Sequence, residues 1–266
     1  GGRYSGAVYV EYGPLVGDVE LSPGADGTFS GAAGDQAGRI VRAGGDLDGD
    51  GVGDIVAGSL ASATSPYSGA VYVLYGPVPG ARDATSADGV LGGENSGDYA
   101  GLALALGDVS GDGLADVAIG SYNSALASLA GAAYVAYGPA SGSVFLGAAE
   151  IIVRGDDAQQ YAGSGLAIDD LDADGANELL VGAYGDATNG GSAGGAYLFT
   201  APTAGTWSVA DADAWLLGEA GGDYAGEGVA MGDLDGDGFG EVVIGAPGER
   251  TGGARAGAVY VSWRVE

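Results

Sequence analysis

An acidic pattern of nine residues recurs four times along the chain, and its spacing is the feature that most constrains the fold. The copies begin at Asp46, Asp108, Asp170 and Asp233, so they lie 62, 62 and 63 residues apart. A fixed period of tens of residues indicates a repeat architecture, in which each unit buries its apolar surface against its neighbours. We therefore expect a single repeat array. Its predicted units are a partial unit at residues 1–35, repeats at 36–98, 99–160 and 161–223, and an incomplete repeat at 224–266.

Each unit reads as short strands separated by glycine-rich turns. In the second repeat the expected strands are residues 101–108, 116–121 and 131–138, followed by a fourth strand with a bend within 143–153. Strands of this length and spacing, with no helical period in any segment, predict an all-β protein. The segment VYVLY at 71–75 is apolar on both faces, so its sheet must be covered on both sides. Sheets stacked face to face satisfy this requirement.

Charge and composition argue against several classes of function. Acidic residues number 36 and basic residues 8, which gives a net charge of −28. A surface this acidic repels nucleic acid and anionic membranes and attracts cations. No apolar run approaches the roughly 18 residues that span a bilayer, so we expect no membrane insertion. Histidine, cysteine and lysine are absent, which removes most nucleophile–base pairs and most transition-metal sites.

The acidic pattern has the spacing D-x-[DS]-x-D-G-x-x-[DE]. Side chains at positions 1, 3, 5 and 9 and a backbone carbonyl at position 7 can converge on one point, and the glycine at position 6 permits a sharp reversal. Such a cage of hard oxygen donors suits Ca²⁺, whereas Mg²⁺ requires stricter octahedral geometry and retains more water. Without a cation the carboxylates repel one another. We therefore expect about four bound Ca²⁺, one per loop.

Two alternative interpretations of the loops fit the sequence less well. An EF-hand needs a bidentate glutamate at position 12 and flanking helices, but position 12 is apolar and lies in an expected strand in every copy. These residues are Ala57, Ile119, Val181 and Ile244. Asp-Gly pairs are also common in simple hairpin turns. Four copies in register favour metal binding over turns alone.

Other landmarks keep the period of the loops. A GAVYV-type strand begins at Gly6, Gly69, Gly131, Gly194 and Gly257; Tyr-Ala-Gly begins at Tyr99, Tyr161 and Tyr224, with Gln36-Ala-Gly in the first repeat; Ile244-Gly245-Ala246-Pro247 follows the fourth loop. Together with the loops, these residues resemble the FG-GAP repeats of the integrin alpha-subunit β-propeller over essentially the whole chain. The resemblance implies four-stranded antiparallel blades with Ca²⁺ in the loop between the first two strands.

The resemblance also implies a ligand set for each loop. Because Ser110 replaces an aspartate, we expect the second site to be the weakest. By position, the predicted ligands are Asp46, Asp48, Asp50, the Val52 carbonyl and Asp54; Asp108, Ser110, Asp112, the Leu114 carbonyl and Asp116; Asp170, Asp172, Asp174, the Ala176 carbonyl and Glu178; and Asp233, Asp235, Asp237, the Phe239 carbonyl and Glu241.

The number of repeats leaves the closure of the array open. Integrin-type propellers usually have seven blades, whereas this chain has four acidic loops and five copies of the GAVYV-type strand. At the seven-fold angle of about 51°, four blades sweep only about 206°. We favour an open arc or solenoid of propeller-type blades, with a closed four-bladed propeller as the alternative. In the closed form an N-terminal fourth strand near Val19 to Leu21 would complete the last blade.

Two further groups of residues receive structural interpretations. Arg154-Gly155-Asp156 spells an adhesion tripeptide, but its Gly-acid pair aligns with Gly93-Glu94 and Gly218-Glu219 and so belongs to the repeat. The tryptophans Trp207, Trp215 and Trp263 lie outside the repeat period; such aromatics can bind sugars or proteins, although packing is the commoner role.

The leading hypothesis is a non-enzymatic, calcium-binding scaffold for adhesion or binding, with an unidentified protein or glycan partner. We expect it to be secreted or at the cell surface, with its targeting signal outside this chain. Open blade edges would also permit self-association. The alternatives are a lectin on the same scaffold and a carboxylate-dependent glycan hydrolase. The acids Glu150, Asp211 and Asp213, which break the repeat, are the candidates for the hydrolase.

Overall fold

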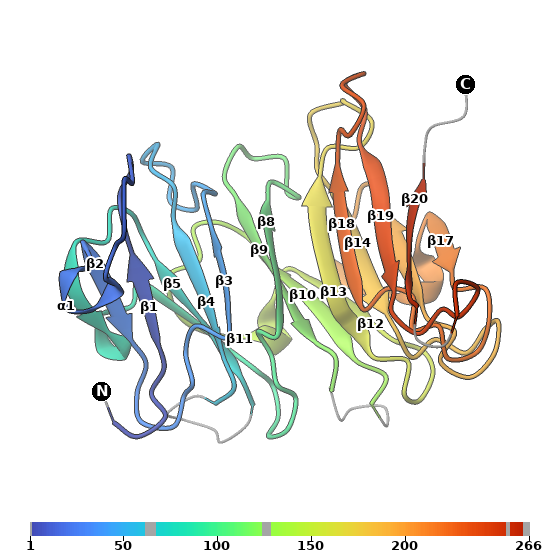
Figure 1. Cartoon of the computed structure of the whole chain (residues 1–266), viewed down its shortest axis with the longest axis horizontal. Helices are drawn as coiled ribbons and strands as arrows, with labels where there is room; N and C mark the ends of the chain where they lie inside the picture. Colours follow the sequence, from blue (N-terminus) through green and yellow to red (C-terminus); the bar gives the residue numbers. More distant parts are fainter. Residues whose placement is uncertain (1, 62–67, 124–128, 254–255, 263–266) are drawn as a thin grey trace.

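The computed structural model describes residues 2–61, 68–123, 129–253 and 256–262, so Trp263 lies outside the described residues. Its strands form five sheets that stand side by side in an open row, with the N-terminal sheet at one end and the C-terminal sheet at the other (Figure 1). The all-β prediction and the open arrangement are confirmed. No helix in the described part of the chain is long and apolar enough to cross a membrane.

Blade 1 shows how one sheet is built. Its antiparallel strands run in the order β3 (Ile40–Ala43), β4 (Ile55–Ser59), β5 (Ala70–Leu74) and β7 (Gly89–Gly92). A fifth strand, β11 (Gly142–Phe145), pairs with β7 in parallel, although it belongs to the next repeat along the chain. Each complete blade therefore has four antiparallel strands of its own, and the following repeat can add one strand to the outer edge.

The other sheets repeat this plan, and the sheets at the two ends of the row have fewer strands. Blade 2 contains β8 (Ala103–Gly107), β9 (Asp116–Ser121), β10 (Ala132–Ala136), β12 (Ile151–Arg154) and the added strand β16 (Gly205–Ser208). Blade 3 contains β13 (Ala162–Asp169), β14 (Glu178–Ala183), β15 (Gly195–Phe199) and β17 (Ala214–Leu217). Blade 4 contains β18 (Gly228–Gly232), β19 (Glu241–Ala246) and β20 (Ala258–Ser262). The N-terminal unit contains β1 (Ala7–Val10) and β2 (Gly27–Ser30), with β6 (Gly80–Asp83) added by the first repeat.

A short helical turn precedes the fourth strand of each unit that has one. These turns are α1 (Leu21–Gly24), η1 (Ala84–Ser86), η3 (Leu146–Ala148) and η4 (Val209–Asp211). In the three repeats, η1, η3 and η4 reverse the chain, so that the added strand lies on the preceding blade while the fourth strand lies on its own.

Two sequence predictions about the fourth strands were wrong. Residues 143–153 do not form one bent strand, because β11 pairs with blade 1, η3 reverses the chain, and β12 joins blade 2. A local apolar pattern does not reveal that its two halves pair with different sheets. The fourth strand of the N-terminal unit is β2, and Leu21 instead begins α1.

The apolar core lies between the sheets. On β5, Val71 and Val73 pack toward blade 2, in one cluster with Ile119, whereas Tyr72 packs toward the N-terminal unit with Phe29. All five residues of β5 are buried. The prediction that these strands are covered on both faces is confirmed, and each blade is stabilised mainly by its neighbours.

Glycines allow neighbouring blades to approach closely. A methyl group on Gly58 in β4 would overlap the carbonyl oxygen of Gly101, which lies just before the first strand of blade 2. Because Gly58 sits against a backbone carbonyl of the next unit, a larger residue at this position would push the blades apart. The same contact joins Gly120 to Gly163 and Gly182 to Gly226.

Candidate metal centre

The four acidic loops connect the first and second strands of the four blades. The acid at position 9 lies just before β4 in blade 1, as Asp54, and is the first residue of the second strand in the other blades. Adjacent loops are also hydrogen-bonded to each other. The Ala115 amide donates to the Asp46 carbonyl at 2.8 Å, the Asn177 amide to the Asp108 carbonyl at 3.2 Å, and the Gly240 amide to the Leu171 carbonyl at 3.0 Å. The loops therefore form one continuous row.

In the first loop, the acids both shape the backbone and face one another. The two carboxylate oxygens of Asp46 accept hydrogen bonds from the amides of Gly49 at 2.7 Å and Gly51 at 2.9 Å. Both glycines have a positive φ, which allows the loop to curl around the aspartate. The oxygens that Asp46, Asp48 and Asp50 offer lie within 4.8 Å of one another. The loop therefore holds three carboxylates around one point.

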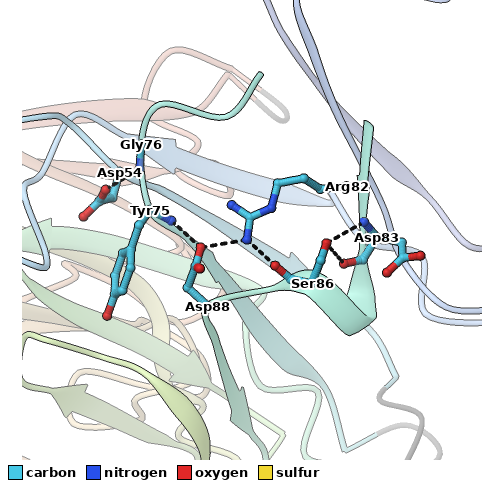
Figure 2. Close-up of polar contacts among 7 residues, drawn as sticks. All are labelled: Asp54, Tyr75, Gly76, Arg82, Asp83, Ser86 and Asp88. Carbon is cyan, nitrogen blue, oxygen red and sulfur yellow. Dashed lines mark hydrogen bonds and ion pairs between the residues drawn. The ribbon is translucent and has the colours of Figure 1, made fainter. Parts of the chain in front are cut away.

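The acid at position 9 of the first loop has a structural role. Asp54 is fully buried, and one of its oxygens accepts a hydrogen bond from the Leu47 amide at 2.6 Å. Its other oxygen accepts a hydrogen bond from the Gly76 amide at 2.7 Å (Figure 2). Burial raises the pKa of Asp54, and these two hydrogen bonds oppose the rise. Asp54 therefore joins the acidic loop to the end of β5, and the cluster of three acids in this loop forms without it.

In the third and fourth loops the position-9 acid is a glutamate and does join the cluster. Glu178 groups with Asp170 and Asp172, again with the offered oxygens within 4.8 Å of one another. One oxygen of Asp170, Oδ1, is buried and has no hydrogen-bond partner. A buried carboxylate oxygen without a partner is costly, and a bound cation would satisfy it. The corresponding group in the fourth loop is Asp233, Asp235 and Glu241.

The second loop differs from the other three, because Ser110 takes the place of an aspartate. Within the described residues, no group of three acids forms in this loop. The Ser110 hydroxyl instead donates to Asp108 at 3.3 Å, and the oxygens of Asp116 accept amides from Val109, Ser110 and Gly138. Burial raises the pKa of Asp116 to about 6, and its hydrogen bonds from backbone amides oppose that rise.

The position-5 aspartates and the position-7 residues also lie close together. In every loop, the amide at position 7 donates to the aspartate at position 5, at distances between 2.7 and 2.9 Å. These hydrogen bonds involve the position-7 amides, so the position-7 carbonyls remain predicted metal ligands. The position-5 acids are Asp50, Asp112, Asp174 and Asp237, and their position-7 partners are Val52, Leu114, Ala176 and Phe239.

The chemistry of the donor set fits Ca²⁺. The donors are carboxylate oxygens from short, glycine-curled loops, which is the coordination that Ca²⁺ prefers. Burial raises the pKa of Glu178 to about 7; the Leu171 amide opposes that rise, and repulsion from Asp172 and Asp170 adds to it. A divalent cation would replace this repulsion with attraction.

The three acids considered for hydrolysis all cap backbone groups. Glu150 accepts the Tyr137 amide and Asp213 accepts the Thr200 amide, in the same way that Asp88 accepts the Tyr75 amide in blade 1 (Figure 2). The interpretation that Glu150 and Asp213 break the repeat was therefore wrong. Asp211 accepts the Ser208 amide in the capping box of η4. Asp88 also forms an ion pair with Arg82 at 2.9 Å.

Arg154 and Asp156 of the adhesion-like tripeptide make polar contacts within the protein, and Trp207 and Trp215 pack against aromatic rings. Arg154 pairs with Glu94 at 3.4 Å, and Asp156 accepts the Ser208 hydroxyl at 2.6 Å. Trp207 packs edge-on against Phe199, with ring centroids 6.2 Å apart. Trp215 packs against Tyr197 but stays 50% exposed on blade 3.

The geometry of the loops agrees with a comparison to known families. The FG-GAP repeat model matches residues 37–74 and 225–262. Each match spans the first strand, acidic loop, second strand and third strand of one blade, blade 1 and blade 4. The chain carries FG-GAP repeats. The blades between the two matched FG-GAP repeats have the same strand order and loop position. A search of curated proteins gave no match.

Proposed function

We propose that this FG-GAP array is a non-enzymatic scaffold whose fold is stabilised by about four Ca²⁺, one in each acidic loop. The observation that carries the proposal is the third loop, where three acids converge and the buried Oδ1 of Asp170 has no hydrogen-bond partner. The first and fourth loops support it with acid clusters of their own. Four Ca²⁺ would reduce the negative net charge from −28 to about −20 and relieve part of the repulsion between carboxylates.

The scaffold is proposed to act outside the cell or at its surface, in adhesion or binding. Ca²⁺ sites of extracellular modules have Kd values of about 10⁻⁴ to 10⁻³ M, which suits loops that serve the fold. An array of blades presents a broad surface to a protein or glycan.

A row of tyrosines is a candidate contact surface for such a partner. The rings of Tyr161 and Tyr184 are stacked with centroids 4.8 Å apart, and Tyr122 lies 6.4 Å from each of them. Tyr224 extends the row at 6.3 Å from Tyr184 and is 41% exposed. Amphipathic rings at a surface suit both sugar rings and protein side chains.

Thermal melts in excess EGTA and in millimolar Ca²⁺ test the proposal. Each site should stabilise the folded state by about 2.7 kcal/mol at a hundredfold excess over Kd, so several sites should raise Tm by well over about ten degrees. Asp172→Asn should reduce the Ca²⁺-dependent rise, whereas the exposed Asp157→Asn should not. A melt that is unchanged by Ca²⁺ would contradict calcium binding.

A further inference from the structure

Each acidic loop is joined to the next one through the same position of the motif. Position 8 stands between the predicted carbonyl ligand at position 7 and the acid at position 9, and from the second loop onward its backbone amide donates to the preceding loop. The acceptor is the carbonyl at position 1 or 2 of that loop. The backbone that carries the ligands of one loop is therefore bonded to the backbone that carries the ligands of the next. The three pairs are Ala115 with Asp46, Asn177 with Asp108, and Gly240 with Leu171.

Leu171 connects the acid clusters of the third and fourth loops. Its amide donates to the Oε2 atom of Glu178 at 2.6 Å, and its carbonyl accepts the Gly240 amide at 3.0 Å. Glu178 belongs to the cluster of the third loop, and Glu241, which directly follows Gly240, belongs to the cluster of the fourth. Two hydrogen bonds through one residue therefore link an acid of one cluster to the residue beside an acid of the next.

Asn177 joins the second and third loops through both its backbone and its side chain. Its backbone amide donates to the Asp108 carbonyl at 3.2 Å, and its side-chain Oδ1 atom accepts the Asp108 amide at 2.8 Å. Asp108 in turn shapes the second loop, because its carboxylate accepts the amides of Gly111 and Gly113, each at 2.7 Å. Position 8 is glycine or alanine in the other three loops. The Asn177 side chain therefore adds a contact that the other position-8 residues cannot make.

The contacts between loops are also closely packed. A methyl group on Gly240 would lie 2.6 Å from the Cδ2 atom of Leu171 and 3.2 Å from its Cα atom. Between the first and second loops, Leu47 is fully buried in one apolar cluster with Ala115. Closely packed groups transmit a displacement, because no free volume is present to absorb it. A change in the backbone of one loop should therefore move the next loop.

Ca²⁺ should order the loop that binds it. Without a cation, the converging carboxylates of the third loop repel one another, and the buried Oδ1 atom of Asp170 lacks a hydrogen-bond partner. The close grouping of the acids is therefore costly until Ca²⁺ binds. Ca²⁺ that fixes one loop also fixes, through position 8, part of the neighbouring loop. The next Ca²⁺ then has less of the chain to order, which raises its affinity.

We propose that neighbouring acidic loops bind Ca²⁺ cooperatively, and that Asn177 is the positioning residue that couples the second loop to the third. The inference rests on the proposed function, because it requires Ca²⁺ in the loops. The coupling acts between neighbours, since the hydrogen bonds of position 8 join adjacent loops. It is also reciprocal, so that Ca²⁺ in the third loop raises the affinity of the second by the same factor as the reverse.

Two double variants compare neighbouring sites with separated sites. Each Asp→Asn substitution removes one predicted carboxylate ligand and disables one loop. Asp48→Asn/Asp112→Asn keeps the third and fourth loops, which are neighbours, whereas Asp112→Asn/Asp172→Asn keeps the first and fourth, which are not. Both variants lose two negative charges, so their net charges match. Calorimetric titration with Ca²⁺ should give a Hill coefficient of about 1.5 for the neighbours, from a coupling of about tenfold, and no higher than 1 for the separated pair.

A further comparison isolates the Asn177 side chain. Asp48→Asn/Asp235→Asn keeps the second and third loops, and its titration should also give a Hill coefficient above 1. Adding Asn177→Ala should lower that coefficient, whereas a purely structural role would change stability and leave the coefficient unchanged. Alanine suits position 8, because Ala115 stands there in the second loop. Adding Asn189→Ala is the control: its side-chain amide donates to a backbone carbonyl that directly follows β17 in the same blade, at 2.8 Å, and the coefficient should not change.

The outcomes separate this inference from the proposed function. A wild type that binds no Ca²⁺ overturns both together. Ca²⁺ binding with Hill coefficients no higher than 1 in all three two-site variants overturns the coupling alone. Equal coefficients above 1 for the neighbouring and separated pairs would mean that Ca²⁺ acts through folding of the whole chain, which overturns coupling through position 8. The role of Asn177 is overturned if the variant that keeps the second and third loops binds a single Ca²⁺, or if Asn177→Ala leaves its coefficient unchanged.

Discussion

The Oδ1 atom of Asp54 accepts a 2.7 Å hydrogen bond from the amide of Gly76, which follows β5 and lies 22 residues further along the chain. Its other oxygen accepts the amide of Leu47 inside the acidic loop. Asp116 makes the same pair of contacts in blade 2, to Gly138 and to Val109. One buried carboxylate thus fixes the acidic loop to the end of the third strand.

Asp54→Asn should therefore destabilise the protein even without metal. The asparagine side chain has only one oxygen that can accept a hydrogen bond. One of the two backbone N–H groups, of Leu47 or of Gly76, therefore loses its acceptor. An unsatisfied buried donor costs about 1–3 kcal/mol, and we expect a loss of this size in the free energy of unfolding, measured in urea with EGTA. Asp157→Asn, at an exposed position, should lose less than about 0.5 kcal/mol. Equal stability of the two variants would contradict the role of Asp54.

Ser110→Asp should strengthen the second metal site. The substitution supplies the carboxylate that the second loop lacks relative to the other three. We expect about a tenfold gain in the affinity of the weakest site, equal to about 1.4 kcal/mol, measured by calorimetric titration with Ca²⁺. Ser143→Asp adds the same charge at an exposed position of β11 and should leave the site affinities unchanged. A titration of Ser110→Asp that matched the wild type would contradict a site in this loop.

Asp186 should control part of the acid stability. Its Oδ2 atom accepts hydrogen bonds from the Tyr197 hydroxyl at 2.6 Å and the Gln160 amide at 2.8 Å. Burial alone would raise the pKa of Asp186, but its hydrogen bonds outweigh burial, and the pKa lies below the usual value. The charged form is therefore favoured in the folded protein. Its contribution is present above the unfolded-state pKa of about 3.9 and is lost as the pH falls through the lower folded-state value.

Asp186→Asn should remove this contribution. We expect a loss of about 1.5–3 kcal/mol at pH 7, since the hydrogen bonds involve a charged group. The difference from the wild type should shrink as the pH falls below about 4. Urea unfolding from pH 7 to pH 2 in EGTA gives both quantities. A stability difference that does not change with pH would contradict the assigned ionisation.

Gly69 and Gly257 form a matched pair that tests the seam between units. Both have a positive φ, at +76° and +68°. A methyl group on Gly69 would overlap the backbone of Ala100 in the next repeat, whereas on Gly257 the nearest atom is 3.5 Å away. Gly69→Ala should cost about 2–5 kcal/mol, from strain and overlap together, and Gly257→Ala only about 1–2 kcal/mol from strain. Thermal and urea unfolding compare the two, and equal losses would rule out overlap at the seam.

Much of the local structure could be predicted from the order of residues. The strand expected at 116–121 coincides with β9, and the acidic loops lie between first and second strands as expected. These features depend on alternation, turn residues and short spacings, which act within a few residues of each other. The deficit of the second loop could be predicted for the same reason, since Ser110 stands within the motif itself.

Only the tertiary structure decided which strands meet. Residues 143–153 were predicted as one strand, yet they pair with two different blades, because the partner of a strand depends on packing between segments far apart in the chain. Asp54 matches the position of a metal ligand, but its bond to Gly76 gives it a structural role. Whether the row of blades closes or stays open likewise depends on the angle at which whole sheets pack, a quantity that no short stretch of residues encodes.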